Sequence, residues 1–405
     1  MLIRRLALSV ALLAVATLLP LAGKAQDRPI KIGVLTDLSS VYADYNGQGS
    51  IIAAQLAIED AGGKAAGRQI ELVSADHQNK ADIGAGIARR WLDTEGVDAL
   101  ADMPNSSVAL AVNDLVREGN KVMLVSAGGT ALLTGERCSP NTVHWTYDTW
   151  AQGHSVARAV LQRGGKTWFF VTADYAFGHD LEKQASEEIV KGGGKVVGGV
   201  KHPLGTADFS SFLLQAQTSG AQVVAFANGG ADLTNSLKQA AEYGLAPKQM
   251  LAALIFDANG VVPLGLKAMQ GLLTVNPFYW DLNDGTRAWA RRFQARHDKR
   301  NMPNSMQAGV YASVLHYLKA VDKVGGSADG RAVVAAMKAL TTDDPLFGKG
   351  RVREDGRKLH PMLLLEVKKP EESKAAWDYF KVVSTIPPEQ AFRPLRDGGC
   401  AFASR

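Results

Sequence analysis

Short apolar runs alternate with amphipathic segments through most of the chain, and this alternation limits the possible fold more than any other feature. Residues 30–35 (IKIGVL) are typical of a buried parallel strand, and residues 50–60 place apolar side chains on one helix face. The same patterns predict strands at 70–74, 97–101, 122–126, 168–172, 195–200, 223–227, 250–255 and 272–275, with helices at 83–94, 108–118, 180–190, 209–217 and 233–243. This order predicts an α/β fold with parallel sheets flanked by helices.

The number of predicted strands indicates two lobes, because one open sheet rarely holds so many. Long helical patterns at 284–298, 306–324 and 330–340 precede late strands at 362–368 and 379–383. No linker rich in glycine, serine or proline separates the lobes, so the chain is expected to cross a hinge several times. We expect lobe 1 to comprise 26–146 plus about 277–355, lobe 2 to comprise 147–276 plus about 356–395, and residues 396–405 to form a tail.

The first 25 residues are typical of a secretory signal peptide. Arg4 and Arg5 precede an apolar core at residues 6–21, and small residues precede a cleavage site after about Ala25. The alternative is a retained membrane anchor, but this core is short for a span of about 20 residues. Cleavage would export the mature chain and change its net charge from +5 to +2, by removing Arg4, Arg5 and Lys24. A charge this small gives no reason to expect nucleic-acid binding.

Export also determines how the two cysteines, Cys138 and Cys400, are interpreted. In an oxidising compartment the simplest interpretation is one disulfide that ties the C-terminal tail to the middle of the chain. The alternative is two buried free thiols. The cysteines match no CxxC metal or redox motif.

Motifs for catalysis or for metal binding are scarce. The eight histidines include no pair at i, i+4 and no HExxH, so no metal site is expected. The chain has no GxSxG and no P-loop, and Gly84–Gly86 follows a polar run where a dinucleotide fingerprint would follow a strand. These features predict a protein that is not an enzyme and uses no cofactor.

Features suited to binding a small molecule follow several predicted strands. Loops at 103–107, 126–130 and 228–232 carry glycines, hydroxyls or amides at strand ends, where α/β proteins hold ligands. Such loops suit a carboxylate, although plain helix capping is the alternative for each of them. Aromatic residues at the same ends would form walls for a partly apolar ligand, and Asp257 could pair with an ammonium group. The candidate ligand-binding residues are Tyr42, Tyr45, Ser106, Ser107, Gly128, Gly129, Thr130, Tyr175, Phe177, Gly229 and Asp257.

An ordered set of segments resembles the leucine/isoleucine/valine-type periplasmic solute-binding proteins of ABC importers. The segments are residues 32–40 (IGVLTDLSS), Ser106–Ser107, residues 126–134 (SAGGTALLT) and residues 174–178 (DYAFG), and their order holds over almost the whole mature chain. The resemblance implies a two-lobed type I periplasmic binding fold that closes by a hinge on its ligand. It also implies a periplasmic protein that works with an inner-membrane ABC permease, and we expect a monomer without a cofactor.

The resemblance also implies roles for individual residues. Tyr45 would form a wall of the site, and Ser107, Gly128 and Thr130 would hold a ligand carboxylate. Asp257 stands near the acidic residue that pairs with an amino group in the amino-acid binders. The chain departs from that pattern at Gly230–Ala231, where an aromatic residue is expected, and in its C-terminal cysteine. We therefore predict a small carboxylate-bearing solute, either an amino acid or an aromatic acid or amide.

Two other functions are compatible with the sequence. One is an exported hydrolase of small amides, which the missing nucleophile motif disfavours. The other is a sensory receptor of the same fold that passes a ligand signal to a membrane partner. Turnover of the ligand would support the hydrolase, and a neighbouring sensor-kinase gene would support the receptor.

Overall fold

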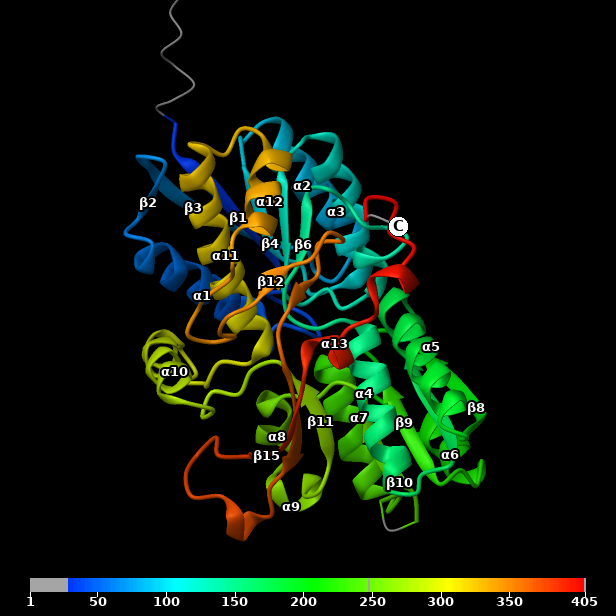
Figure 1. The fold of residues 1–405 in the computed structure, drawn as a ribbon. Helices are drawn as coiled ribbons and strands as arrows, with labels where there is room; N and C mark the ends of the chain where they lie inside the picture. Colours follow the sequence, from blue (N-terminus) through cyan, green and yellow to red (C-terminus); the bar gives the residue numbers. More distant parts are fainter. Residues whose placement is uncertain (1–27, 247, 404–405) are drawn as a thin grey trace, which may run out of the picture.

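The computed structural model describes residues 28–246 and 248–403, and it divides them into two α/β lobes that lie one above the other (Figure 1). The predicted signal peptide lies outside the described residues. Within those residues, no helix is both long enough and apolar enough to cross a membrane.

The upper lobe is built on a six-stranded sheet with the order β2-β3-β1-β4-β5-β6, parallel except for the pair β2–β3. Its strands are β1 (Ile30–Thr36), β2 (Lys64–Ala65), β3 (Arg68–Asp76), β4 (Ala99–Asp102), β5 (Val122–Val125) and β6 (Thr142–His144). Its helices are α1 (Gly47–Asp60), α2 (Ala81–Asp93), α3 (Ser106–Glu118), α10 (Asp284–Arg296), α11 (Ser305–Val324) and α12 (Gly330–Ala339).

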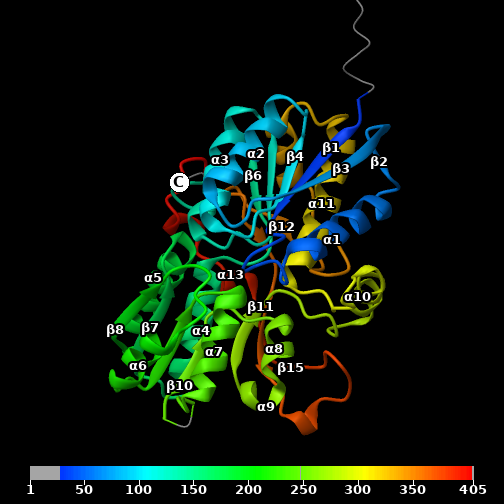
Figure 2. The ribbon, with the colours of Figure 1, turned by 180° about the vertical axis from the view of Figure 1, so that it is seen from behind.

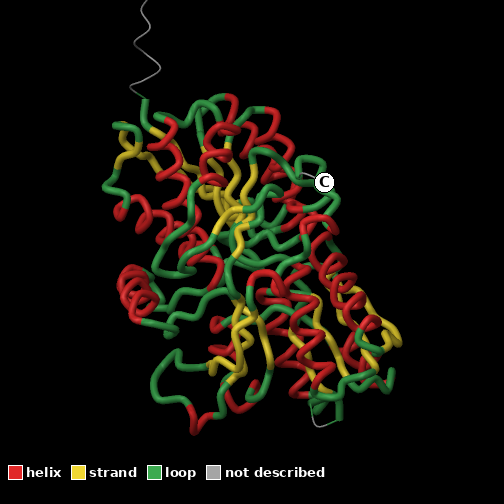
Figure 3. Tube along the Cα trace, in the orientation of Figure 1, coloured by secondary structure: helices red, strands yellow, loops and turns green. Residues whose placement is uncertain are grey.

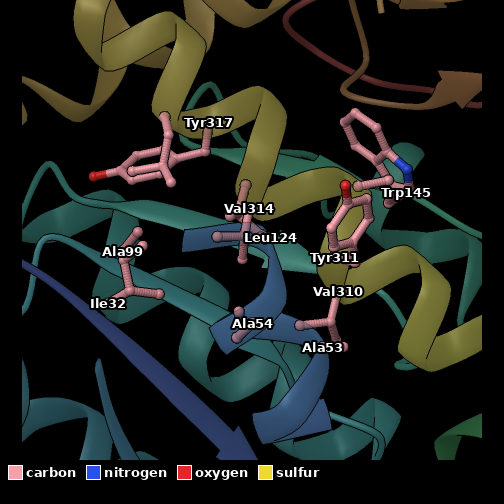
Figure 4. Close-up of a cluster of buried hydrophobic side chains, with 14 of the residues drawn as sticks. Ile32, Ala53, Ala54, Ala99, Leu124, Trp145, Val310, Tyr311, Val314 and Tyr317 are labelled. Carbon is pink, nitrogen blue, oxygen red and sulfur yellow. The ribbon is translucent and has the colours of Figure 1, made fainter. Parts of the chain in front are cut away.

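Successive strand residues of the upper lobe pack on opposite faces of the sheet, as the two-residue period of a strand requires. In β5, Leu124 packs into the cluster with α1 and α11, whereas Met123 packs into the cluster with α2 and α3. Figure 4 shows the first of these clusters, in which Val310 and Val314 of α11 approach the sheet. Helices on both faces explain why the central strands β1, β4 and β5 are mainly apolar.

The lower lobe repeats this plan on a four-stranded parallel sheet with the order β10-β9-β7-β8. Its strands are β7 (Thr167–Ala173), β8 (Lys195–His202), β9 (Val223–Ala227) and β10 (Met250–Ala253). Its helices are α4 (Thr149–Gln162), α5 (Ala176–Lys191), α6 (Ser210–Thr218), α7 (Gly230–Glu242), α8 (Ala258–Leu264) and α9 (Leu266–Met269). Residues of β7 alternate between a core with α4 and α5 and a core with α6 and α7.

The α/β fold with helix-flanked parallel sheets is confirmed, with one addition. A three-stranded antiparallel sheet of β11 (Leu273–Asn276), β14 (Met362–Val367) and β15 (Phe380–Ile386) adjoins the lower lobe. Strands β14 and β15 are joined without a crossover helix, so the chain turns back and pairs antiparallel. The remaining elements are short: β12 (Arg351–Val352), β13 (Lys358–Leu359), α13 (Pro388–Ala391) and the 3₁₀ turns η1 (Ala131–Thr134), η2 (Pro370–Glu372) and η3 (Leu395–Asp397).

The C-terminal tail returns to the upper lobe, which the views from both sides show (Figures 1 and 2). After α13 the tail packs on the loop around η1, where the Arg393 guanidinium donates to the Ala131 carbonyl at 2.9 Å. Cys400 forms a disulfide with Cys138, as predicted. Loops fill the zone where the chain passes between the lobes (Figure 3).

Candidate functional site

A pocket lies between the lobes, where loops that follow strands of the upper sheet meet loops that follow strands of the lower sheet. It contains about 470 Å³ of space between atoms, including solvent at its rim. Its lining residues are Tyr42, Tyr45, Asn46, Pro104, Ala127, Tyr147, Tyr175, Phe177, Gly229, Gly230, Leu233, Ile255, Phe256, Asp257, Asn276 and Met306. Ligand sites of open α/β sheets occupy this position, beyond the carboxyl ends of the strands.

Tyrosine rings from the two lobes meet across the pocket. The hydroxyls of Tyr42, from the β1–α1 loop, and Tyr175, just after β7, are hydrogen-bonded to each other. Burial raises the pKa of both phenols above the usual range, so both remain protonated at neutral pH. This contact joins the lobes directly and defines a closed arrangement.

The aromatic residues are placed by specific local contacts. The buried Asp37 carboxylate follows β1 and accepts from the backbone N–H groups of Ser40 and Tyr42, both at 2.9 Å, which folds the loop that carries Tyr42. In the lower lobe, Phe177 lies against Gly129 of the upper lobe. A Cβ atom added at Gly129 would lie 2.8 Å from the Phe177 ring, so this close approach requires glycine.

The polar groups of the pocket are few, and none of them is basic. Asp257 is buried and caps α8, accepting from the Ala258 N–H at 2.7 Å and from the Ser305 hydroxyl at 2.8 Å. Burial raises the pKa of Asp257. Asn276 donates to the Phe256 carbonyl at 2.8 Å, while its own side-chain oxygen has no partner among the described residues. That oxygen is a free acceptor on the pocket wall.

The structure brings six of the predicted ligand-binding residues together on this pocket. They are Tyr42, Tyr45, Tyr175, Phe177, Gly229 and Asp257. The other five lie beside the pocket without lining it: Ser106, Ser107, Gly128, Gly129 and Thr130. Contact of these five with a ligand stays a prediction, as does the carboxylate-holding role of Ser107, Gly128 and Thr130.

Several polar groups of the two predicted carboxylate loops already have partners. The Thr130 hydroxyl donates to the Asp180 carboxylate of α5 at 2.7 Å, and the Thr130 N–H donates to the Ser106 hydroxyl at 3.2 Å. The Ser107 N–H donates to the Asn105 side chain at 2.8 Å, which caps α3. In this closed arrangement the loop after β5 binds a carboxylate of the protein itself, that of Asp180.

Sequence reasoning missed several residues that line the pocket. Gly230, Ile255 and Phe256 lie within two residues of the predicted site residues Gly229 and Asp257. The rule that ligands bind beyond the carboxyl ends of parallel strands could therefore have included them. Asn276 ends β11 and Met306 begins α11, and both reach the pocket from the second passage of the chain between the lobes. No sequence signal indicated that the segment from β11 to α11 lies beside the strand-end loops of the first half of the chain.

Asp102 organises the upper half of the site. It ends β4 with φ +83°, is fully buried, and accepts from Thr36 at 2.7 Å, Asn46 at 2.8 Å and Ser126 at 2.9 Å. Thr36 ends β1, Asn46 precedes α1 and Ser126 directly follows β5. Asn46 also lines the pocket. A strained backbone held by a buried hydrogen-bond hub is typical of a functional site.

We expect Asp102→Ala to lower the free energy of unfolding by about 3 kcal/mol, because three buried donors lose their acceptor. Urea denaturation of the mature protein measures this change. Asp93→Ala, which removes an exposed carboxylate at the end of α2, is the matched control and should change stability by less than about 0.5 kcal/mol. Equal stability of the two variants would contradict the role assigned to Asp102.

The described residues include no group of three or more His, Cys, Asp or Glu side chains placed to hold a metal ion. The pocket combines aromatic walls with one buried carboxyl group, the free amide oxygen of Asn276 and the unpartnered hydroxyl of Tyr45. This arrangement can enclose a small, partly apolar molecule between two lobes, which is the architecture of a solute-binding protein.

Comparison with known proteins identifies the family. The family described as periplasmic binding protein matches residues 29–374, and the chain belongs to this family. The chain is thus a solute-binding component of an ABC import system, and proteins of this kind work with membrane permeases. The resemblance to the leucine/isoleucine/valine-type proteins is confirmed.

Two solved structures and a curated relative are similar to this chain over most of its length. A periplasmic binding protein from Burkholderia mallei is 48% identical with a TM-score of 0.90, covering 93% of this chain and 99% of its own. A branched chain amino acid ABC transporter periplasmic ligand-binding protein from Burkholderia xenovorans is 44% identical with a TM-score of 0.81. The match covers 92% of this chain and 99% of its own. A Leu/Ile/Val-binding protein homolog from Brucella melitensis is 26% identical, covering 87% of this chain and 90% of its own.

Proposed function

We propose that this protein captures a small solute with an apolar or aromatic body by closing its two lobes around the pocket that Tyr42 and Tyr175 bridge. The solute class comprises amino acids, aromatic acids and their amides. The observation that carries the proposal is the hydrogen bond between these two tyrosines, because it joins loops of opposite lobes over an aromatic pocket. The Burkholderia xenovorans relative, named for branched-chain amino acids, supports the amino-acid part of this class.

The proposed mature protein begins after the signal peptide and has two lobes, each built from two segments of the chain. Cleavage after about Ala25 would release a monomer of 26–405 into the periplasm, where it would deliver solute to an inner-membrane permease without transforming it. Lobe 1, the upper lobe, would comprise 26–146 and about 277–355. Lobe 2, the lower lobe, would comprise 147–276 and about 356–395. The separate cores of the two lobes support these boundaries, because α11 packs on the upper sheet and β14 packs with the lower lobe.

A thermal-shift screen of the mature protein tests this function. The panel contains aliphatic amino acids, aromatic acids, short amides and urea-like solutes. A solute at 100 times its Kd adds about 2.7 kcal/mol of stability, so the melting midpoint should rise by degrees. The solute should be recovered chemically unchanged.

Two results of the screen would contradict the proposal. Turnover of the stabilising solute would identify an enzyme. Stabilisation that is unchanged when Phe177 is replaced by alanine would place the binding site outside the pocket, since Phe177 forms part of its wall.

A further inference from the structure

The carboxylate of Asp180 occupies a set of donors that suits an anion. One of its oxygens accepts from the Thr149 hydroxyl at 2.6 Å, the Thr130 hydroxyl at 2.7 Å and the Ala131 N–H at 2.9 Å. The other oxygen accepts from Gln184 at 3.1 Å. Two hydroxyls and a backbone N–H converging on one oxygen form a strong hydrogen-bond set for a carboxylate.

Asp180 connects the two lobes. It lies on α5 of the lower lobe, whereas Thr130 and Ala131 follow β5 of the upper lobe. Phe177, three residues earlier on α5, shares its helix face and lies against Gly129 in the same loop. Asp180 therefore docks the helix that carries a wall of the pocket onto the opposite lobe.

The pocket itself offers little to a second carboxylate. No lysine, arginine or histidine is among its lining residues, and its one ionisable acid is Asp257. Desolvating an anion there without a cation would cost several kcal/mol. Two pocket groups have no hydrogen-bond partner among the described residues: the side-chain oxygen of Asn276, which accepts, and the hydroxyl of Tyr45, which can donate or accept. An acceptor beside a hydroxyl suits an amide or amine head group, whose N–H can donate to Asn276.

We propose that Asp180 is an intramolecular carboxylate that occupies anion-binding donors of the upper-lobe loop after β5 and of Thr149 at the start of α4, so that the pocket selects an aromatic or apolar solute with an amide or amine head group over the matching free acid. This inference rests on the proposed function and narrows its solute class. In it, the protein supplies the carboxylate that bridges the lobes, and the solute supplies the apolar body and a hydrogen-bond donor.

Paired probes test the head group. Calorimetric titration of the mature protein with benzamide and benzoate, and with leucinamide and leucine, should give at least about 10-fold tighter binding of the amide in one pair, a difference of about 1.4 kcal/mol. In Asp180→Ala, the vacated donors should shift the acid-to-amide affinity ratio at least about 10-fold toward the acid. Glu187→Ala, which removes an exposed carboxylate further along α5, is the matched control and should leave the ratio unchanged.

A second measurement needs no solute. Distances between spin labels on the two lobes of the ligand-free protein should report a smaller closed population in Asp180→Ala than in wild type or Glu187→Ala. Asp180→Asn keeps the side-chain volume and should show the same direction of change, so the test remains decisive if the alanine variant fails to fold.

Several results would overturn the inference. They are tighter binding of the acid by wild type, an acid-to-amide ratio that Asp180→Ala does not change, or identical distance distributions in wild type and both Asp180 variants. If neither pair binds but another panel solute does, the proposed function stands and the head-group assignment is wrong. If no solute of any class binds, the proposed function and the head-group assignment both fail, and the distance measurement still decides whether Asp180 docks the lobes.

Discussion

Replacing Gly230 with alanine is expected to lower solute affinity at least about 100-fold, which corresponds to about 2.8 kcal/mol of binding free energy. Gly230 begins α7 of the lower lobe with φ +61° and lies against the β1–α1 loop of the upper lobe. A Cβ atom there would clash with the backbone carbonyl of Val41 and lie 2.8 Å from the Tyr42 ring. The clash exists in the closed arrangement, where the Ala231 N–H also donates to the Val41 carbonyl at 2.9 Å.

The matched control separates this clash from backbone strain. Gly244 has φ +66°, and a Cβ atom there would meet no heavy atom within 4 Å. Both alanine variants should lose about 1 kcal/mol of stability from the left-handed backbone, whereas Gly230→Ala alone should lose affinity. Titration calorimetry and thermal melts measure the two effects, and similar affinities for the two variants would show that closure at Gly230 is not needed for binding.

The second large effect is expected from removing the disulfide. Cys138 and Cys400 are 262 residues apart in sequence, so the bond closes a long loop in the unfolded chain. The chain-entropy relation gives a stabilisation of about 5.6 kcal/mol for such a loop. In a protein of this size, the double variant Cys138→Ser with Cys400→Ser should melt roughly 7 °C lower than wild type.

Reductant provides the control for this prediction. Wild type in excess dithiothreitol should melt at the lower temperature of the double serine variant, and the variant itself should not respond to reductant. An unchanged melting midpoint in the variant would mean that the tail contributes nothing to global stability. In that case the Arg393 contact with Ala131 would not depend on the covalent tie.

The fold was largely predictable because burial on both faces makes parallel strands apolar throughout. The predicted strand at residues 30–35 corresponds to β1, and the predicted helix at residues 306–324 corresponds to α11. Helix α11 also has strong end signals, with an Asn304–Gln307 capping box and Gly325 in the left-handed region. Such signals act locally, so they can be read without knowledge of tertiary contacts.

Helix α4 was missed because the first half of its buried surface is unusually polar and small. It buries Gln152, Gly153, His154 and Ser155, and larger apolar residues such as Val156 and Val160 are buried only in its second half, so the apolar stripe is short. A Cβ atom at Gly153 would lie 3.0 Å from the Gln184 Cβ of α5, so glycine permits close packing of the two helices. This helix depends on tertiary contacts that its hydrophobic period does not reveal.

Six of the sixteen residues that line the pocket were predicted from the sequence, and several of the others reach the pocket through contacts between the lobes. The rule that ligands bind beyond the carboxyl ends of parallel strands located Tyr42, Tyr175 and Gly229, since residues after parallel strands gather at one edge of each sheet. It could not reveal that Asp180 faces Thr130, because that contact joins residues 50 positions apart through the docking of two lobes. The sequence therefore indicated the loops that gather around the site but not the partners of their side chains.

Small-angle X-ray scattering tests the central claim, that the lobes close around a solute in the pocket. The measurement compares the radius of gyration of the mature protein without solute and with a saturating concentration of the solute that stabilises it most. We expect the radius to fall in wild type and in Gly244→Ala, and to stay at its ligand-free value in Gly230→Ala at the same solute concentration. An unchanged radius in wild type, at a concentration where calorimetry shows full binding, would contradict capture by lobe closure.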